Sequence, residues 1–317
     1  MRIFVIYSSE HKLHNPKWEF FEGRKIAHRE IPERIEMIRI ALERRRLGLI
    51  ITPSEFSLED IYTVHNKEYV GFIKNTSSSL KRSEVIYPKE YSIDMYTPIL
   101  SGTYKAARLA ADCALTAAVL IRNGESLVYA LCRPPGHHAE TRRMGGYCYF
   151  NSAAIAAQCL SKNGKVAILD IDFHHGNGTQ EIFYQRPDIL YVSIHADPSV
   201  RYPYFSGLTS EIGMGKGIGC NKNYPLPLGT GNKQYRRTLG KGLADIKNFH
   251  PRYLVVSAGF DTFEADPIGG FKLTDTFYNV IGQDIRALRL PMLIVQEGGY
   301  EVSGLGDVVC NFLEGLL

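Results

Sequence analysis

The chain has 317 residues, of which 44% are hydrophobic and 22% are charged, and its formal net charge is +4 at pH 7. These proportions are ordinary for a soluble globular protein, and the length allows one large core or two small ones. The charge is dispersed, and its one cluster, Arg44-Arg45-Arg46, falls at the C-terminus of a predicted helix, where cations suit the helix dipole. We therefore expect no nucleic-acid partner.

The cysteines and the N-terminus bear on the cellular compartment. The six cysteines have no C-x-x-C spacing and mostly lie in apolar or small-residue surroundings, so we expect reduced, buried thiols. The apolar run at residues 2–7 turns polar at Ser8, too soon for a signal peptide, and no window reaches the length of a membrane span. These features predict a cytoplasmic protein with no membrane partner.

In its first half the chain alternates short apolar runs with amphipathic segments. Strands are predicted at 2–7, 49–51 and 127–131, and helices at 32–47, 57–72 and 102–121. Residues 11–30 show no clean period and mix aromatic with charged side chains, which predicts a loop that folds over another part of the molecule. Residues 76–94 are polar and irregular, as in a surface loop.

The second half continues the alternation. Strands are predicted at 166–170, 191–194, 253–257 and 292–295, and helices from an Asn151 cap to residue 160, at 234–248 and at 274–288. Residues 197–231 form a long connection rich in Gly, Tyr and Pro, and such connections are usually functional. Because the strands are apolar throughout, the predicted fold class is α/β: a single domain over residues 1–317, with a central parallel sheet flanked by helices on both faces.

Reactive side chains follow four of these strands. They lie in the stretches Arg133-Pro134-Pro135-Gly136-His137-His138, Leu169 through Thr179, Ala258-Gly259-Phe260-Asp261 and Glu297-Gly298-Gly299-Tyr300. In parallel α/β folds, ligands bind beyond the carboxyl ends of the strands. We therefore expect the four stretches to meet in one crevice, which would be the active site.

Two carboxylates and an imidazole converge after the strand at 166–170. Side chains alternate along a strand, so Asp170, Asp172 and His174 project to one side. Asp172 and His174, with Asp261 from another strand end, form a set of the kind that holds catalytic zinc with a position left open, and without a thiolate it also suits Mn²⁺ or Fe²⁺. The simpler alternative is that the acids cap the next helix or contact solvent.

The tandem histidines and the last tyrosine are candidates for proton transfer. His137 and His138 follow a Pro-Pro-Gly turn that would place them rigidly, whereas an arbitrary histidine pair is more often exposed or structural. Tyr300 follows two glycines and could present its hydroxyl to a developing oxyanion, although most such tyrosines only pack.

Together with Gly145-Gly146-Tyr147-Cys148-Tyr149-Phe150-Asn151, these stretches resemble, in order and residue type, the arginase/deacetylase superfamily. The resemblance is to its zinc-dependent histone deacetylases and acetylpolyamine amidohydrolases. The segments 193–198 and 261–268 are most similar to the acetylpolyamine amidohydrolases. The resemblance implies the arginase/deacetylase fold and hydrolysis of an acetyl amide to acetate and a free amine.

The resemblance also implies a role for each candidate residue. These roles are zinc binding for Asp172, His174 and Asp261, general base and then acid for His138, electrostatic partner held by Asp170 for His137, and polarisation of the acetyl carbonyl for Tyr300. A structural K⁺ would be held by the carboxylates of Asp170 and Asp172, the carbonyls of His174 and Ile194, and the hydroxyl of Ser193. Asn177 departs from the family, in which several members have an aspartate that pairs with the second histidine; a neutral partner should leave His138 less basic.

Substrate recognition is predicted by resemblance alone. The expected channel residues are Tyr147, Tyr202, Gly146 and Gly298, and the alternative is that both tyrosines are merely packed. Glu19, Glu22 and Asp94 lie in loops that could offer carboxylates to an amine, although surface acids are usually just solvated. The region of residues 76–100 is short compared with the segment through which acetylpolyamine amidohydrolases narrow their site by dimerisation. This argues against a site narrowed by a partner subunit, leaves a homodimer open, and keeps acetyl-lysine peptides as alternative substrates.

The leading hypothesis is a zinc-dependent amidohydrolase that deacetylates acetylated amines, above all acetylpolyamines, and the alternative is a protein or peptide acyl-lysine deacetylase. Two further hypotheses are an acetyl-binding protein without catalysis and an arginase-like manganese hydrolase. His137, His138 and Tyr300 argue against the first of these. The absence of further acids near the tandem histidines to hold a second metal argues against the other.

Overall fold

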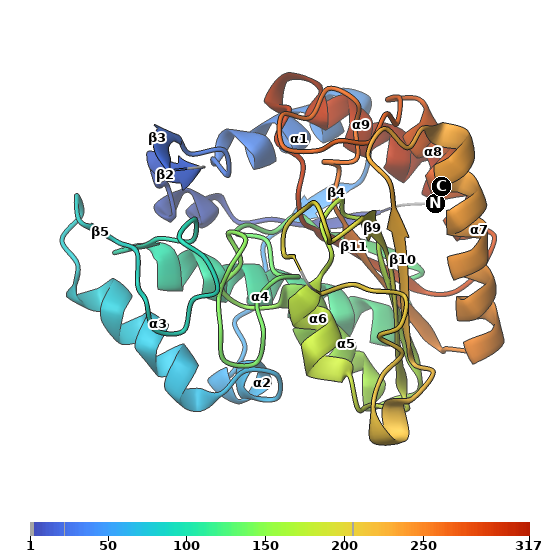
Figure 1. The fold of residues 1–317 in the computed structure, drawn as a ribbon, viewed down its shortest axis with the longest axis horizontal. Coiled ribbons are helices and arrows are strands. Elements are labelled where there is room, and N and C mark those ends of the chain that lie inside the picture. The colour runs from blue at the N-terminus through green and yellow to red at the C-terminus, as the bar shows by residue number, and fades with distance from the viewer. Residues whose placement is uncertain (1–2, 22, 205) are drawn as a thin grey trace.

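The computed structural model describes residues 3–21, 23–204 and 206–317. Its main sheet consists of the strands β1 (Phe4–Ile6), β4 (Leu49–Ile51), β7 (Leu127–Ala130), β8 (Val166–Asp170), β9 (Ile189–Ala196), β10 (Asn221–Leu226), β11 (Tyr253–Ala258) and β12 (Met292–Gln296). All pair in parallel, in the order β10-β9-β8-β11-β12-β7-β1-β4 (Figure 1). The parallel α/β architecture predicted from the apolar strands is confirmed.

Helices cover both faces of this sheet (Figure 1). One face packs against α1 (Glu33–Arg45), α7 (Asn232–Phe249), α8 (Phe277–Arg286) and α9 (Val302–Leu316). The other packs against α2 (Leu58–Tyr62), α3 (Lys67–Ser79), α4 (Thr103–Arg122), α5 (Ser152–Ser161) and α6 (Asn177–Phe183). Because both faces are covered, the strands are buried on both sides, which explains why they are apolar throughout.

The strand order positions the site. The four strands that precede the reactive stretches, β8, β11, β12 and β7, are consecutive in the sheet. Their carboxyl ends therefore lie next to one another, and the loops that follow them converge on a single crevice. Asn151 begins α5 as predicted, with its side chain accepting the backbone N–H of Ala154 at 2.9 Å.

The segment 11–30 is not the loop that the sequence predicts. It carries most of a 3-10 turn, η1 (Ser9–Leu13), and an antiparallel hairpin of β2 (Trp18–Phe21) with β3 (Arg24–Ala27). The hairpin lies outside the main sheet, and β3 is exposed or half-buried along its whole length, so the segment lacks the apolar runs that mark the strands of the main sheet.

Four further segments differ from the predicted elements. The helix predicted at 57–72 is two helices, because Asn66 interrupts it and caps α3 with hydrogen bonds from the N–H groups of Glu68 and Tyr69. The loop predicted at 76–94 contains the end of α3 and β5 (Val85–Ile86), which pairs with β6 (Ile99–Leu100). The connection at 197–231 contains η2 (Gly215–Gly217) and the edge strand β10. Helix α9 was not predicted.

The structure bears on two predictions, that the cysteines are reduced and that the chain has no membrane span. All six cysteines are free, four of them buried and two half-buried. Over the described ranges, none of the helices combines the length and apolar character that crossing a bilayer would require.

Candidate active site

Three side chains from two neighbouring strand ends form a compact cluster of metal-binding type. Asp172 and His174 follow β8, and Asp261 follows β11. Each offers one ligand atom, and these atoms lie within 4.8 Å of one another. His174 Nδ1 is 2.9 Å from Asp261 Oδ2 and 3.4 Å from Asp172 Oδ1. The structure thus brings together the three predicted zinc ligands.

Backbone groups hold the carboxylates of this cluster in place. Asp172 accepts the N–H of His174 at 2.9 Å on one oxygen and the N–H of Gly298 at 2.9 Å on the other. Asp261 accepts the N–H of Phe173 at 2.8 Å. A Cβ at Gly298 would lie 2.5 Å from Asp172 Oδ2 and 2.8 Å from Asp261 Oδ2, so only glycine fits there. Gly298 therefore packs directly against the carboxylates of this cluster, whereas the sequence placed it in the channel wall.

The charges of this cluster suit a divalent cation. Asp172 and Asp261 are both buried, and burial together with the neighbouring Asp172 carboxylate raises the pKa of Asp261 to about 7. Two buried carboxylates this close are costly unless a positive charge lies between them. Two carboxylates and one imidazole without a thiolate are donors that Zn²⁺, Mn²⁺ and Fe²⁺ accept, so the residues present fit a catalytic metal ion.

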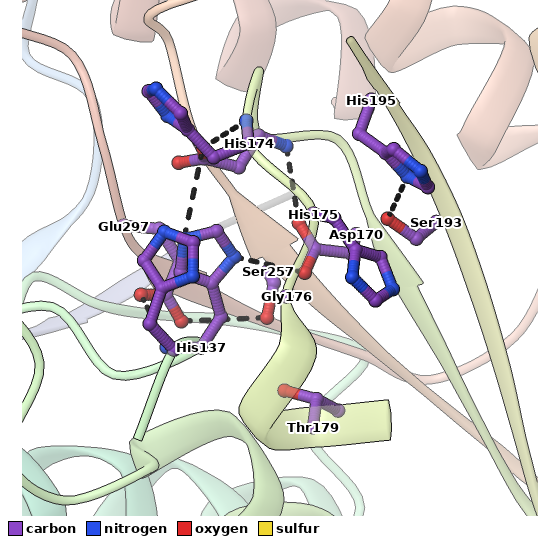
Figure 2. A network of polar contacts seen from close by, with 12 residues as sticks. His137, Asp170, His174, His175, Gly176, Thr179, Ser193, His195, Ser257 and Glu297 are labelled. Atoms are coloured by element: carbon purple, nitrogen blue, oxygen red, sulfur yellow. Dashed lines mark hydrogen bonds and ion pairs between the residues drawn. The ribbon is translucent and has the colours of Figure 1, made fainter. Parts of the chain in front are cut away.

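His137 is tied to the β8 strand end. Its Nδ1 lies 3.1 Å from Asp170 Oδ2, and Figure 2 shows His137 among Asp170 and Glu297. The N–H groups of Gly136 and His137 donate to Glu297 Oε2 at 2.7 and 3.2 Å. Burial lowers the pKa of His137, but the carboxylates of Asp172 and Asp170 outweigh burial and raise that pKa to about 10. The buried carboxylates of Asp170 and Asp172 therefore favour the protonated form of His137.

His138 has a different environment from its neighbour. Its Nδ1 lies 2.8 Å from Asn177 Oδ1, and its ring packs on Gly146, where a Cβ would fall 2.2 Å from the ring. Burial, with the nearby His137 and His174, holds the pKa of His138 well below its usual range. The pKa values of the tandem histidines are thus shifted in opposite directions because their partners differ.

Tyr300 lines the crevice opposite these histidines. Asp266 accepts its backbone N–H at 2.6 Å, and the guanidinium of Arg34 lies 4.5 Å from the centre of its ring. Burial raises the pKa of the Tyr300 hydroxyl well above its usual range, so that hydroxyl is a proton donor. Its ring is 5.8 Å from that of Tyr147, which faces it across the cavity.

A cavity of about 280 Å³ leads from the rim to this cluster. Its lining residues are Arg29, Tyr96, His138, Gly146, Tyr147, His174, Arg201, Tyr202, Tyr204, Pro267, Ile268, Gly269 and Tyr300. Three of the predicted channel residues, Tyr147, Tyr202 and Gly146, are among them. Arg201, Tyr202 and Tyr204 come from the connection at 197–231, whose length predicted a functional role.

Of the three predicted amine-binding acids, Glu19 and Asp94 are hydrogen-bonded to tyrosines that line the cavity. Glu19 is buried behind the wall: its Oε2 accepts the Tyr147 hydroxyl at 2.8 Å, and its Oε1 lies 3.9 Å from Arg29 Nε. Asp94 is committed to the protein on both oxygens, because Tyr202 OH donates to one at 2.8 Å and Tyr96 N to the other at 2.8 Å. Glu22 lies outside the described residues.

Three of the five predicted potassium ligands lie on two paired strands, Asp170 on β8 and Ser193 with Ile194 on β9, whereas Asp172 and His174 follow β8. Asp170 of β8 is opposite Ser193 of β9 in the sheet register. Asp170 Oδ2 also accepts the Tyr191 hydroxyl at 2.9 Å, and the Ser193 hydroxyl is 2.8 Å from His195 Nδ1 (Figure 2). Asp170, predicted to serve two sites, thus contacts His137 and the β9 strand at once.

A buried ionic network supports the site and was not predicted. Glu30 Oε1 accepts from Arg133 Nε at 2.7 Å and from Arg34 Nη1 at 2.6 Å. Arg34 also donates to the carbonyl oxygens of Glu297 and Gly299, next to Tyr300. Burial raises the pKa of Glu30, but the two guanidinium groups outweigh it and hold that pKa at about 2. No local pattern in the sequence links residue 30 to residue 133, so only the folded structure shows this network.

Comparisons with known proteins agree with this geometry. The sequence model described as the histone deacetylase domain matches residues 28–316. Acetylpolyamine amidohydrolase 1 of Pseudomonas aeruginosa is 39% identical to this chain, covering 98% of it and 97% of that protein, and the acetylpolyamine amidohydrolase of Mycoplana ramosa is 40% identical, covering 98% and 99%. The crystal structure of acetylpolyamine aminohydrolase from Burkholderia pseudomallei superposes with a TM-score of 0.94 at 35% identity and covers 99% of this chain and 98% of its own.

Proposed function

The chain belongs to the histone deacetylase domain family and is a deacetylase, and we propose that its substrates are acetylated amines, above all acetylpolyamines, which it hydrolyses to acetate and the free amine. The observation that carries the proposal is the buried Glu19 carboxylate behind the channel wall. Its Oε1 has no hydrogen-bond partner among the described residues, and Arg29 Nε lies 3.9 Å from it, so the Glu19 carboxylate offsets positive charge at this wall and favours a cationic substrate over an anionic one.

The residues of the crevice have complementary tasks in this reaction. Asp172, His174 and Asp261 would hold a divalent ion, which supplies Lewis-acid polarisation of the acetyl carbonyl and a more acidic water. His138, neutral and turned to the cavity, accepts the proton of the attacking water and returns it to the leaving amine. Tyr300 donates its hydroxyl hydrogen to the carbonyl oxygen as negative charge develops there.

The other predicted roles follow from the same geometry. We propose that His137, held by Asp170, stabilises the negative charge of the site electrostatically. A structural K⁺ between Asp170 and Ser193 would neutralise carboxylate charge beneath the metal ligands, and the register of β8 with β9 supports it. The single main sheet and the match from residue 28 to 316 support one catalytic domain over residues 1–317, and the free cysteines support a cytoplasmic location.

The rim limits which acetylated amines fit. Arg29 and Arg201 line the cavity, and none of its described lining residues is acidic. A second ammonium group close to the acetyl end would be attracted by the Glu19 carboxylate behind Tyr147, whereas ammonium groups farther out would meet the arginines. We therefore propose that acetylated diamines are better substrates than longer acetylpolyamines.

A second candidate is an acyl-lysine peptide. The positive rim favours this candidate if acidic residues flank the acetyl-lysine, because those residues would pair with Arg29 and Arg201.

Turnover of acetylputrescine, acetylspermine and acetyl-lysine peptides by the zinc-loaded protein tests the proposal. We expect kcat/KM to fall in the order acetylputrescine, acetylspermine, neutral peptide. Turnover of peptides alone would refute the polyamine assignment, and preference for peptides with acidic flanks would establish the second candidate.

A further inference from the structure

A hydrogen-bonded chain connects the tandem histidines to the protein surface. Asn177 Oδ1 lies 2.8 Å from His138 Nδ1, and Asn177 Nδ2 donates to Glu140 Oε1 at 2.9 Å. The other oxygen of Glu140 pairs with Arg143, with Nε at 2.7 Å and Nη2 at 2.6 Å. His138, Asn177 and Glu140 are buried, whereas the Arg143 side chain is 57% exposed.

The partners of Asn177 determine which way its amide points. On one side lie Glu140 Oε1 at 2.9 Å and the carbonyl oxygen of His138 at 3.4 Å. A carboxylate and a carbonyl only accept hydrogen bonds, so the NH₂ group must face them. In the flipped orientation the amide oxygen would face two oxygens. The carbonyl oxygen of Asn177 therefore faces His138, independently of how oxygen and nitrogen are distinguished in the side chain.

This orientation determines the tautomer of His138. Because the amide oxygen of Asn177 is an acceptor, His138 must carry a proton on Nδ1 to bond it. The neutral ring then has its lone pair on Nε2. That edge of the ring lies against Gly146, at the wall of the cavity. A base of this kind needs its free nitrogen on the substrate side.

We propose that Glu140 is a positioning residue for the reaction: its carboxylate fixes the Asn177 amide, which holds His138 in the tautomer that presents Nε2 to the substrate. The inference rests on the role proposed for His138. In the sequence, Asn177 stands where several family members have an aspartate that contacts the histidine directly. In this chain the carboxylate belongs to Glu140, and Asn177 lies between it and His138.

Glu140→Gln tests the chain directly. A glutamine has one carbonyl oxygen for two donors, Asn177 and Arg143, and its NH₂ group must face one of them. When that group faces Asn177, the amide flips and presents NH₂ to His138 Nδ1, which moves the ring proton to Nε2. We expect kcat to fall by about tenfold or more with KM within twofold, as for other residues that orient a catalytic ligand. The matched control is Glu181→Gln, because Glu181 is an exposed acid of α6 whose carboxylate, within the described part of the chain, bonds Thr141, the residue after Glu140.

A second substitution separates positioning from folding. Asn177→Asp alone places two carboxylates side by side and should lower kcat, whereas in the Glu140→Gln background the aspartate accepts directly from His138 Nδ1 and should restore kcat to within about threefold of the parent chain. Recovery in a chain that still lacks Glu140 cannot arise from folding. A kcat of Glu140→Gln equal to that of the Glu181→Gln control, or no recovery in the double variant, would overturn the proposal.

The tautomer can be read without a substrate. In the NMR spectrum of ¹⁵N-histidine-labelled protein, the two nitrogen signals of His138 are the pair that is lost in His138→Gln. We expect these signals to show a protonated Nδ1 and an unprotonated Nε2 in the parent chain, and the reverse in Glu140→Gln. A parent ring protonated on Nε2 would overturn the inference. Since this spectrum does not depend on the substrate, and kcat can be measured with acetyl-lysine peptides, failure of the polyamine assignment would leave this test intact.

Discussion

The carboxylate of Asp266 accepts the backbone N–H of Tyr300 at 2.6 Å. The same oxygen accepts the N–H of Glu301 at 3.2 Å, and the other accepts those of Ile268 and Gly269 at 3.0 and 3.2 Å. One side chain thus joins the loop after β11 to the loop after β12. The position of the Tyr300 hydroxyl depends on a residue that itself does not line the cavity.

Replacing Asp266 with Asn should weaken the hydrogen bonds that connect the loop after β11 to the loop after β12. An amide offers one accepting oxygen, so two of the four backbone N–H groups would face an NH₂ group and lose their partner. We expect the free energy of unfolding to fall by about 2 kcal/mol and kcat to fall more than ligand affinity. Urea unfolding and steady-state kinetics measure both. Glu264→Gln, an exposed acid of the same loop, is the control; equal behaviour of the two variants would contradict the assigned role.

Replacing Tyr300 with Phe should separate binding from turnover. The ring and its contacts with Arg34 and Tyr147 remain, and only the hydroxyl is lost. We expect kcat to fall by about 10²–10³-fold with nearly unchanged affinity for a substrate analogue. Calorimetric titration and kinetics of the same preparation give the two numbers. Tyr204→Phe, at the exposed rim, should retain its turnover; unchanged turnover in Tyr300→Phe would rule out its role as donor.

Removing the metal should weaken the fold as well as stop the reaction. Without a cation, the buried carboxylates of Asp172 and Asp261 are left unneutralised. We expect chelation to lower the thermal unfolding midpoint by several degrees and abolish turnover, and Zn²⁺ to restore both. Comparison with Mn²⁺ and Fe²⁺ ranks the candidate ions. Full turnover by protein shown to be metal-free by elemental analysis would exclude a catalytic ion.

Acid should destabilise the protein through His65. Its Nδ1 lies 3.0 Å from the Glu140 carbonyl and its Nε2 accepts the N–H of Asn151 at 2.8 Å, so the buried ring is neutral. Burial lowers its folded-state pKa from 6.5 to about 4. Between these values only the unfolded chain binds the proton, so stability is lost as the pH falls from about 6.5 towards 4, by up to about 3 kcal/mol for this residue.

The slope of unfolding free energy against pH checks this. His65→Gln should flatten part of the slope between pH 6.5 and 4 relative to the parent chain. A slope in His65→Gln identical to that of the parent chain would show that His65 titrates alike in the folded and unfolded chain.

Replacing Glu19 with Gln should affect cationic substrates selectively. Glu19 is the acid beside Arg29, and without its charge the rim becomes more positive. We expect KM for acetylputrescine to rise about tenfold, with KM for a neutral acetyl-lysine peptide within twofold. An equal rise for both substrates would show that Glu19 only supports Tyr147 through its hydroxyl bond.

Much of the architecture follows from local pattern. The inner strands are continuous apolar runs, and the residues at their ends identify the crevice because parallel neighbours end at one edge of the sheet. By contrast, β10 contains Pro225, which argues against a central strand, and is tolerated because β10 is an edge strand. Helix α9 contains Gly304 and Gly306, which lower helix propensity, yet Gly306 lets it approach α1 so closely that a Cβ would lie 2.6 Å from the Met37 carbonyl oxygen.

In the site, too, some residues were predictable from local sequence pattern and others were not. Asp172, His174 and Asp261 were predictable because each directly follows a strand, and the structure brings them together. Glu30, Glu140 and Asp266 were missed, since each acts through contacts made only in the folded chain. Their partners are 103, 37 and 34 residues away in the sequence, and no periodicity records such pairings.

Arg133, at the strand end before the tandem histidines, also donates to the carbonyl oxygens of His11 at 2.9 Å and His14 at 2.6 Å. The family match begins only at residue 28. A chain trimmed to that boundary would lose two of the four hydrogen bonds described for this buried guanidinium, although no catalytic atom had been removed. The carbonyl groups of His11 and His14 therefore take the place of water around a buried cation, and a shortened version of this enzyme has to retain them.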